Sequence, residues 1–329
     1  MASLKAAYIG DPYQIARVYS LTARAAISER VSVLEGVVSA SNVNARLPEL
    51  AEVDILLSTW GMPLLEDRIF DQIPNLKLVL YAAGDTRGFA GPLVKRRIPV
   101  VSAWRANAIP VAEFTLAQIL MAGKQYSQNV RSYRRERDVS LSSRGFGNAG
   151  QTVSILGAGA VGTALIELLE PFAWKILVFD PFLSKSQAAE LGVEQVNLID
   201  AFLRGNVVSN HLANNEGTRQ LITKELLARM PKGATFINTG RGATVDQTGL
   251  SEVMQMRPDL SAVLDVTVPE PLLADSSLWA LENVFLSTHI AGSEENELTR
   301  MADLCVDELK RFLAGEPLLH QVRPQDLEL

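Results

Sequence analysis

The stretch that decides the fold is "ILGAGAVGTALIELL", Ile155 to Leu169, where three glycines stand between an apolar, strand-like run and a helical one. Gly157, Gly159 and Gly162 have the spacing G-x-G-x-x-G. In a dinucleotide-binding turn the first glycine permits the turn, the second lets the backbone approach a pyrophosphate, and the third lets the helix pack on the strand. The alternative is a tight turn that uses small residues for packing alone, so the surrounding sequence has to decide.

The residues after the turn favour a nucleotide. The phosphates would bind to free amides at the start of the helix, near Ala160 and Val161, where the helix dipole favours negative charge. The next strand, "KILVFD", ends in Asp180, at the spacing of roughly 20 residues where a carboxylate accepts hydrogen bonds from the adenosine ribose. Asp180 would repel a 2′-phosphate, and Pro181 and Phe182 supply no arginine to bind one. The sequence therefore predicts NAD rather than NADP as the cofactor.

Strand-like and helical stretches alternate along the whole chain, which is the pattern of parallel sheets. With 329 residues, 47% of them hydrophobic, the chain is long enough for two domains. The predicted fold class is α/β with two doubly wound parallel sheets, and most strands are apolar enough to be covered on both faces. Helices are expected over 109–125, with Pro110 in the first turn, and over 294–313, while 126–151 are expected to form a long connection or arm. The expected strands are 5–9, 33–38, 53–57, 77–81 and 98–102 in one set, and 153–156, 175–179, 207–209, 234–238, 261–264 and 284–286 in the other.

The composition argues against several classes of function. No apolar run reaches the ~18 residues of a membrane span, and the N-terminus lacks a signal-peptide pattern, so a cytoplasmic protein is expected. The formal net charge of -6 argues against a nucleic-acid partner. The basic segment "RSYRRER", 131–137, is interpreted as a solvated helix face rather than a polyanion site. The single cysteine, Cys305, excludes intramolecular disulfides and is expected to be a buried thiol.

Three further segments carry chemically useful side chains, each at or just after the end of an expected strand. They are "INTGRGATVD" (237–246), "LDVTVPEPL" (264–272) and "LSTHIAGS" (286–293). Ligands of open α/β sheets bind outside the carboxyl ends of the strands. Arg241, Glu270 and His289 are therefore expected in one site.

These three residues suit hydride transfer between a nicotinamide and a 2-hydroxy acid. Arg241 can bind a carboxylate through two parallel hydrogen bonds, and His289 can exchange a proton with the 2-oxygen of the substrate. Glu270 would favour the imidazolium form of the histidine and orient its ring. The nicotinamide carries the hydride, so no metal is required. Taken singly, each residue has a structural alternative: a surface ion pair, a helix-start acid and a strand-end histidine.

The run from Gly157 to Ser293 resembles the D-isomer-specific 2-hydroxyacid dehydrogenases, the family of phosphoglycerate dehydrogenase, glyoxylate/hydroxypyruvate reductase and D-lactate dehydrogenase. The likeness lies in the glycine turn with its following acid, the N-T-x-R-G-x-x-V-D segment, the D-V-x-x-x-E-P segment and the H-I-A-G sequence. It implies that Arg241 binds the substrate carboxylate, that His289 is the acid/base and that Glu270 is its partner. It also implies that Asp265 lies near the nicotinamide carboxamide.

Before this run, "LVLYAAGDTRGF" (78–89) resembles the substrate loop of the family. The resemblance implies that amides around Ala83 and Gly84 help to hold the carboxylate. Trp60 and Arg87 are further candidates for contact with the substrate, although packing in a core or hinge is the favoured alternative for Trp60. Trp60 lies in a loop, 58–63, where some phosphoglycerate dehydrogenases place phosphate-binding arginines, so 3-phosphoglycerate is in doubt as the substrate unless Arg87 or Arg105 takes their role.

The resemblance also implies the domain layout. A Rossmann NAD-binding domain, 107–292, would be inserted in a flavodoxin-like substrate-binding domain made of 1–106 and 293–329. The protein would be a homodimer through the NAD domain and would act on a small-molecule 2-hydroxy or 2-oxo acid. The rival hypothesis is an NAD(H)-sensing regulatory protein, like the transcriptional co-repressors of this fold, which can retain the same three residues. His211 is expected to be structural and His320 to be exposed.

Overall fold

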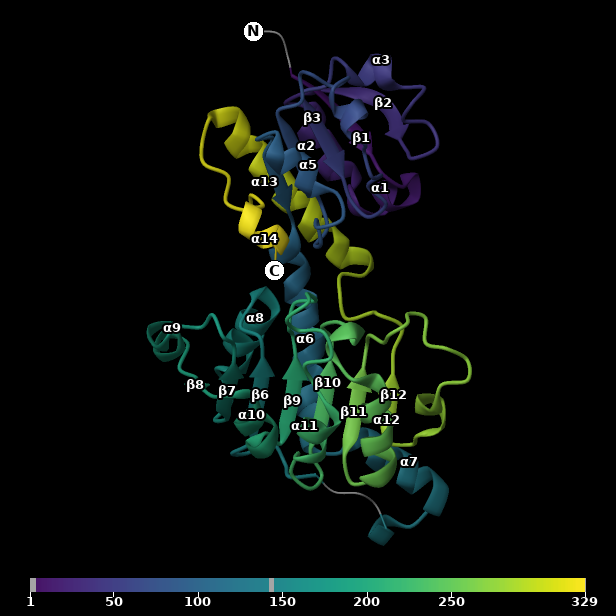
Figure 1. Ribbon diagram of the computed structural model, residues 1–329, viewed down its shortest axis with the longest axis vertical. Coiled ribbons are helices and arrows are strands. Elements are labelled where there is room, and N and C mark those ends of the chain that lie inside the picture. Colours follow the sequence, from purple (N-terminus) through teal and green to yellow (C-terminus); the bar gives the residue numbers. More distant parts are fainter. Residues whose placement is uncertain (1–3, 142–144, 329) are drawn as a thin grey trace. The chain divides into compact units, whose positions relative to one another are not determined.

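The computed structural model describes residues 4–141 and 145–328. The chain forms two compact units: a terminal unit made of Met1–Asn107 and Ser293–Leu329, and a central unit, Ala108–Gly292 (Figure 1). Each unit is built on its own parallel sheet. The fold class is therefore α/β with two doubly wound sheets, as the alternation of strand-like and helical stretches predicts.

The terminal unit has a five-stranded sheet in the order β2-β1-β3-β4-β5. This is the flavodoxin-like order, in which the strand sequence reverses beside β1. Helices α1, α2 and α13 pack on one face, around residues such as Ile55 and Leu80, and α3, α4 and α5 pack on the other, around Leu56 and Val79. The elements are β1 (Lys5–Ile9), α1 (Pro12–Val18), α2 (Leu21–Ser28), β2 (Ser32–Val38), α3 (Leu47–Leu50), β3 (Ile55–Ser58), α4 (Asp67–Phe70), β4 (Leu78–Tyr81), α5 (Ala90–Lys95), β5 (Val100–Ser102), α13 (Thr299–Ala314) and α14 (Pro324–Glu328).

The C-terminal segment of this unit extends the sheet beyond β5. Val101 forms an antiparallel bridge with Gln321, and the Val322 N–H donates to the Val100 carbonyl at 2.7 Å. His320, which was expected to be exposed, is half-buried, because strand pairing holds its backbone against the sheet edge. Its Nδ1 is buried, and burial lowers the pKa of His320. Cys305 on α13 is buried as predicted, and burial raises the pKa of its thiol to about 12.

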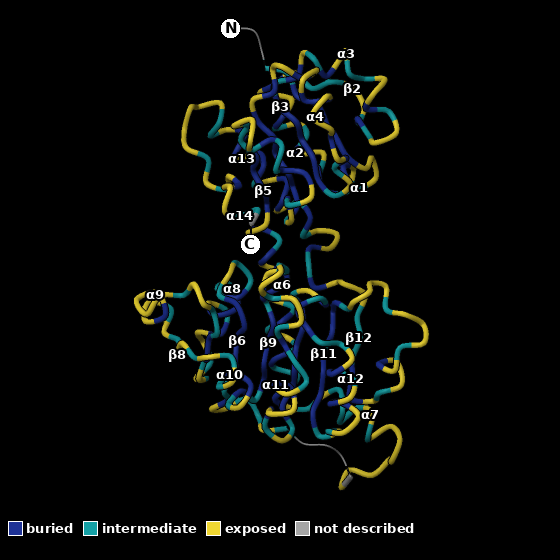
Figure 2. Tube along the Cα trace, viewed as in Figure 1, coloured by how far each residue is buried: buried dark blue, intermediate teal, exposed yellow. Residues whose placement is uncertain are grey.

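The central unit has a seven-stranded sheet in the order β12-β11-β10-β9-β6-β7-β8. Helices α10, α11 and α12 pack on one face and α6 and α8 on the other, so neighbouring strand residues such as Phe236 and Ile237 belong to different cores. Figure 2 shows the strands of this sheet largely buried. The elements are α6 (Trp104–Gly123), α7 (Tyr126–Glu136), β6 (Thr152–Leu156), α8 (Ala160–Leu169), β7 (Lys175–Phe179), α9 (Lys185–Glu190), β8 (Glu194–Gln195), α10 (Leu198–Arg204), β9 (Val207–Asn210), α11 (Lys224–Ala228), β10 (Thr235–Asn238), α12 (Gln247–Met256), β11 (Ser261–Leu264) and β12 (Val284–Leu286).

Four details differ from the sequence-based expectations. Strand β8 was missed because its two residues are too few and too polar to give a strand pattern, and β2 is largely exposed because it lies at a sheet edge. Pro110 lies inside α6 rather than in its first turn, because the helix begins at Trp104. The expected connection contains α7, which begins at Tyr126; its last residues belong to the basic segment for which a solvated helix face is expected, and they are helical and mostly exposed. Residues 142–144 of that connection lie outside the described residues.

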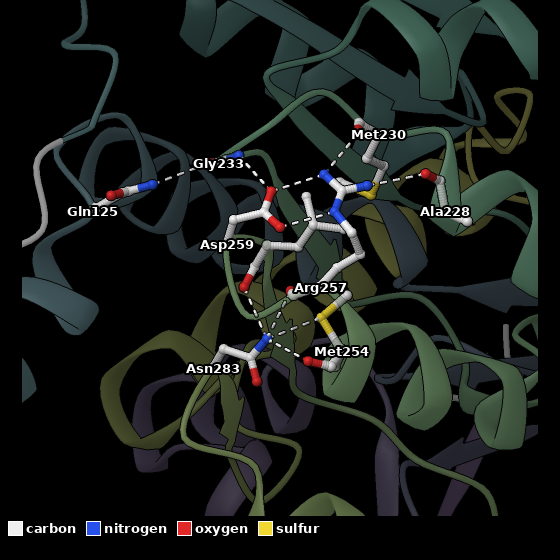
Figure 3. Close-up of polar contacts among 9 residues, drawn as sticks. Gln125, Ala228, Met230, Gly233, Met254, Arg257, Asp259 and Asn283 are labelled. Atoms are coloured by element: carbon white, nitrogen blue, oxygen red, sulfur yellow. Dashed lines mark hydrogen bonds and ion pairs between the residues drawn. The ribbon is translucent and has the colours of Figure 1, made fainter.

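A polar network lies at the end of the seven-stranded sheet where its parallel strands begin, here called the amino edge (Figure 3). Arg257, which ends α12, binds Asp259 through two contacts of 2.8 Å, and Asp259 also accepts the Gly233 N–H at 3.2 Å. The side-chain amide of Asn283 donates to the Met254 and Leu260 carbonyls, each at 3.0 Å. The network ties the segment before β10, β11 and β12 to the end of α12, so it fixes where these strands begin.

Candidate active site

The backbone of the glycine turn after β6 requires glycine at two of its three positions and leaves open space at the third. Gly157 has a φ of 95°, and a Cβ there would lie 3.0 Å from the His211 carbonyl oxygen. A Cβ on Gly162 would come within 2.0 Å of the Gly157 carbonyl oxygen, so only glycine lets α8 approach the strand this closely. A Cβ on Gly159 would meet nothing within 4 Å, which leaves open space beside the backbone there. The turn therefore fits a dinucleotide pyrophosphate.

The first turn of α8 and the end of β7 complete this region. Ala160 and Val161 begin α8, whose N-cap, Gly159, provides no side-chain hydrogen bond. The Asp180 carboxylate accepts the Ala158 N–H at 2.7 Å through Oδ2 and the Phe182 N–H at 2.8 Å through Oδ1. These two bonds hold Asp180 beside the glycine turn, where a ribose next to the pyrophosphate can be reached.

His289 and Glu270 form a direct pair. His289 Nδ1 and Glu270 Oε1 are 2.5 Å apart, and the two side chains are 44% and 43% exposed. Glu270 lies in the loop after β11, and His289 lies in the loop after β12 with a φ of 61°, a left-handed backbone that is uncommon outside glycine. Because Nδ1 is engaged by the carboxylate, Nε2 is the ring nitrogen left for proton exchange with a ligand.

Arg241 lies directly after β10, at the same carboxyl edge of the sheet. Its backbone carbonyl accepts hydrogen bonds from the Thr244 hydroxyl at 2.8 Å and the Asn238 amide at 3.3 Å, which fixes the loop. The side chain is exposed and donates from Nη1 to the Gly240 carbonyl. Within residues 4–141 and 145–328, no carboxylate is recorded as its ion-pair partner. Arg241 thus presents a guanidinium that can bind an anionic ligand.

The predicted substrate-loop residues and Trp60 belong to the terminal unit. Ala83 and Gly84 follow β4, and their carbonyls accept the Ser102 hydroxyl at 3.0 and 2.6 Å. Trp60, after β3, is partly buried and packs against both apolar cores of the unit. Arg87 is bound by Asp85 through its Nε at 2.9 Å and through a second contact from Nη2. Trp60 thus has the packing role that the sequence favoured. Arg87 stabilises its own loop through its ion pair with Asp85.

A family model described as D-isomer specific 2-hydroxyacid dehydrogenase, NAD binding domain, matches residues 116–291, which is more than half of the chain. The chain belongs to this family. Glyoxylate reductase of Korarchaeum cryptofilum is 30% identical over 276 residues, which cover 82% of each chain. D-3-phosphoglycerate dehydrogenase of Mycobacterium tuberculosis is 30% identical over 271 residues, which cover 82% of this chain and 51% of that protein. The chain thus spans about half the length of the phosphoglycerate dehydrogenases it matches.

Solved structures show the same fold. A phosphoglycerate oxidoreductase from Rhizobium etli has a TM-score of 0.83 at 23% identity, covering 98% of this chain and 99% of that one. The apo form of Rhodotorula graminis D-mandelate dehydrogenase has a TM-score of 0.83 at 20% identity, covering 98% of both chains. Together with the family match, these comparisons make the protein an NAD-dependent oxidoreductase of the 2-hydroxyacid dehydrogenase family. None of the helices in the described ranges is both long and apolar enough to cross a membrane.

Asp265 of this dehydrogenase lies behind the histidine loop. It is buried, and its Oδ1 accepts the Ser287 hydroxyl at 2.7 Å and the Ile290 N–H at 2.9 Å, while Oδ2 accepts the Ala291 N–H at 2.9 Å. Its carboxylate thus ties both flanks of His289 to the end of β11. The sequence marked Asp265 through the D-V-x-x-x-E-P segment, but its bonds to residues more than twenty positions later were not visible there.

His211 of the dehydrogenase lies beside the glycine turn and was expected to be structural. Its Nε2 is 2.8 Å from the Ser209 hydroxyl and its Nδ1 is 3.3 Å from the Thr239 hydroxyl. The residue reaches the surface in part, but desolvation of the ring lowers the pKa of His211 to about 3. The ring is therefore neutral at physiological pH, and its hydrogen bonds join the ends of β9 and β10 next to Gly157.

Proposed function

We propose that this dehydrogenase interconverts a D-2-hydroxy acid and the corresponding 2-oxo acid, with Arg241 binding the carboxylate and the His289–Glu270 pair exchanging the proton. The observation that carries the proposal is the 2.5 Å contact between His289 Nδ1 and Glu270 Oε1. In the reductive direction His289 donates a proton from Nε2 to the carbonyl oxygen, and Glu270 stabilises the imidazolium and orients the ring. The left-handed backbone at His289, and the N–H groups of Ile290 and Ala291 that donate to the Asp265 carboxylate, support a ring held in one place.

We assign cofactor binding to 107–292 and substrate binding to 1–106 with 293–329. NAD supplies the hydride acceptor or, when reduced, the hydride donor. Gly157, Gly159 and the amides at Ala160 and Val161 would hold its pyrophosphate, which the open space beside Gly159 supports. Asp180 would bind the adenosine ribose, and its negative charge would disfavour the 2′-phosphate of NADP.

We propose that the substrate lacks a phosphate group. Arg87, the nearest cation to the Ala83–Gly84 loop along the sequence, is engaged by Asp85, and the contact raises the pKa of the Arg87 guanidinium. Trp60 lies in the loop where the family resemblance would place phosphate-binding arginines, and it packs against apolar residues. The relatives include proteins named for glyoxylate, mandelate and phosphoglycerate, and the absence of a basic side chain at position 60 favours the two without phosphate.

We also propose a homodimer formed through the central unit. Helix α7 carries two half-exposed aromatic side chains, Tyr126 and Tyr133, which a partner subunit would cover. Sedimentation velocity measures the mass in solution. A monomer at micromolar concentration would contradict the proposed dimer. It would not bear on the proposed enzyme activity.

The activity is tested by following NADH and NADPH absorbance with glyoxylate, hydroxypyruvate, phosphohydroxypyruvate, pyruvate and larger aliphatic and aromatic 2-oxo acids. We expect NADH to be oxidised fastest by a 2-oxo acid whose side chain is uncharged. We expect the His289→Ala variant to lose turnover. Tight NADH binding without turnover of any 2-oxo acid would instead support the NAD(H)-sensing alternative. Preference for phosphohydroxypyruvate would overturn the proposed substrate class alone.

A further inference from the structure

The three residues that follow β4, Ala82 to Gly84, accept hydrogen bonds from hydroxyl groups at the ends of both neighbouring strands. The Thr59 hydroxyl, at the end of β3, donates to the Ala82 carbonyl at 2.8 Å. The Ser102 hydroxyl, at the end of β5, lies 3.0 Å from the Ala83 carbonyl oxygen and 2.6 Å from the Gly84 carbonyl oxygen. Both hydroxyl-bearing residues are buried, and β4 lies between β3 and β5 in the sheet.

The contact with Ser102 determines where the amides of the loop point. In a trans peptide the N–H is directed opposite to the carbonyl of the same peptide plane. Since the Ala83 carbonyl is turned towards Ser102, the Gly84 N–H is turned away from it. No hydrogen bond from the Gly84 N–H is recorded within the described ranges, and Gly84 is only partly buried. An N–H held in this way is a donor ready for an anionic ligand.

Ser102 is itself fixed by the protein rather than by a ligand. Its N–H donates to the His320 carbonyl at 3.1 Å, and the neighbouring Val101 pairs with Gln321. The segment around His320 is held in turn by Glu308, a buried carboxylate that accepts the Leu319 N–H at 3.1 Å. The hydroxyl therefore has a rigid base from which to orient the loop.

We propose that Ser102 is a positioning residue of this dehydrogenase: its hydroxyl holds the Ala83–Gly84 peptide so that the Gly84 N–H faces the carboxylate of the 2-oxo acid. The inference rests on the proposed function, because it takes the substrate to be a 2-oxo acid whose carboxylate meets this loop. Without the hydroxyl the two carbonyls lose a buried donor, and the peptide is free to rotate away from the binding orientation.

The test compares Ser102→Ala and Ser102→Thr with Ser154→Ala, a matched control. Ser154 is also a buried strand serine whose hydroxyl donates to one backbone carbonyl, that of Ala201 at 2.7 Å, but it lies inside the central unit. KM and kcat are measured at saturating NADH with the 2-oxo acid of the panel that the wild type reduces fastest. NADH binding is followed by fluorescence titration, and folding is followed by thermal melting.

We expect Ser102→Ala to raise KM for the 2-oxo acid about tenfold, with a smaller change in kcat and unchanged NADH affinity. Ser102→Thr, which keeps the hydroxyl, is expected to restore most of the affinity. Ser154→Ala is expected to lower the melting temperature and leave KM unchanged. If Ser102→Ala does not fold, Ser102→Cys replaces it, because the thiol keeps the volume but is a weak donor.

A KM within twofold of the wild type in the folded Ser102 variant would overturn the inference, and so would an equal rise in KM for Ser154→Ala. Either result would leave the proposed activity in place, since the wild type turns over in the same assay. Absence of turnover by the wild type with every 2-oxo acid would overturn the proposed function, and the role of Ser102 with it.

Discussion

The two edges of the seven-stranded sheet in the central unit use polar residues in opposite ways. At the amino edge, Arg257 and Asp259 pair with each other, and the side-chain amide of Asn283 donates hydrogen bonds to backbone carbonyls (Figure 3). At the carboxyl edge, the Arg241 side chain bonds to a neighbouring backbone carbonyl and to no carboxylate of the described residues, and the His289–Glu270 pair remains nearly half exposed. One edge is complete without a ligand, whereas the other holds charged groups that a ligand would complete.

The difference separates stability from function within one fold. Polar groups that bond to one another at a buried edge stabilise the folded chain, because each would cost free energy if it lost its partner. Arg241, Glu270 and His289 at the carboxyl edge make fewer such bonds, and ligands of open α/β sheets bind at this edge. Substitutions at the two edges should therefore change different measured quantities.

The largest effect is expected at His289. The conservative change His289→Gln keeps the size of the side chain but removes proton exchange, so kcat should fall about 1,000-fold in both directions of the reaction. Stopped-flow and steady-state NADH absorbance measure the loss, and NADH affinity should stay unchanged as the control. A kcat within threefold of the wild type would show that the proton comes from another group.

The next effect is expected at Arg241. Arg241→Lys keeps the charge but cannot form two parallel hydrogen bonds with a carboxylate, so KM for the 2-oxo acid should rise about 10- to 100-fold. The melting temperature should be unchanged, since among the residues that the structure describes the guanidinium bonds only to the Gly240 carbonyl. Arg219→Lys, in the same unit, is the control for a general effect of the substitution. Unchanged KM would contradict carboxylate binding by Arg241.

At the amino edge the effect should appear in stability alone. Asn283→Ala leaves the buried Met254 and Leu260 carbonyls without their donor, which should lower the free energy of unfolding by about 2 kcal/mol. KM and kcat should match the wild type below the transition. Asn75→Ala, which removes an exposed amide bonded to the Ala51 carbonyl, is the control and should cost much less. A change in KM without a loss of stability would contradict the separation of the two edges.

The smallest effect is a pH-dependent one at Asp259. The Arg257 guanidinium holds the pKa of the Asp259 carboxyl below its ordinary value, so the folded state gains stability when the carboxyl is charged. That contribution is present above the unfolded pKa, near ~4, and is lost as pH falls through the lower folded pKa. Asp259→Asn should therefore lower stability by about 1 kcal/mol at pH 7 and by less at pH 3.

Thermal melting of both proteins at the two pH values checks this prediction. Asp307→Asn is the matched control, because the Asp307–Lys310 pair is largely exposed and should contribute little at either pH. A destabilisation by Asp259→Asn that is equal at pH 7 and pH 3 would show that the charge of Asp259 does not carry the effect.

Several elements could be predicted because their signals are local. Most of the expected strands contain continuous apolar runs that became buried parallel strands, whereas β2, β7 and β12 are partly exposed. The glycine turn could be predicted because its three glycines lie close together in the sequence and the acid follows at the spacing of roughly 20 residues that the motif requires. Strand β8 could not be predicted, because its two residues carry no strand pattern and pair with β7 only in the fold, and of α7 only the basic segment was interpreted as helical.

The sequence by itself determined the α/β class, the family and the residue types that the carboxyl edge would carry, since these follow from apolar periodicity and short motifs. Only the tertiary structure decided how those residues are held: Asp265 behind the His289 loop, and Ser102 beside the Ala83–Gly84 peptide. The physical reason is that a hydrogen bond acts over about 3 Å in space. The partners from neighbouring strands stand many residues apart in the chain, so no local pattern records them.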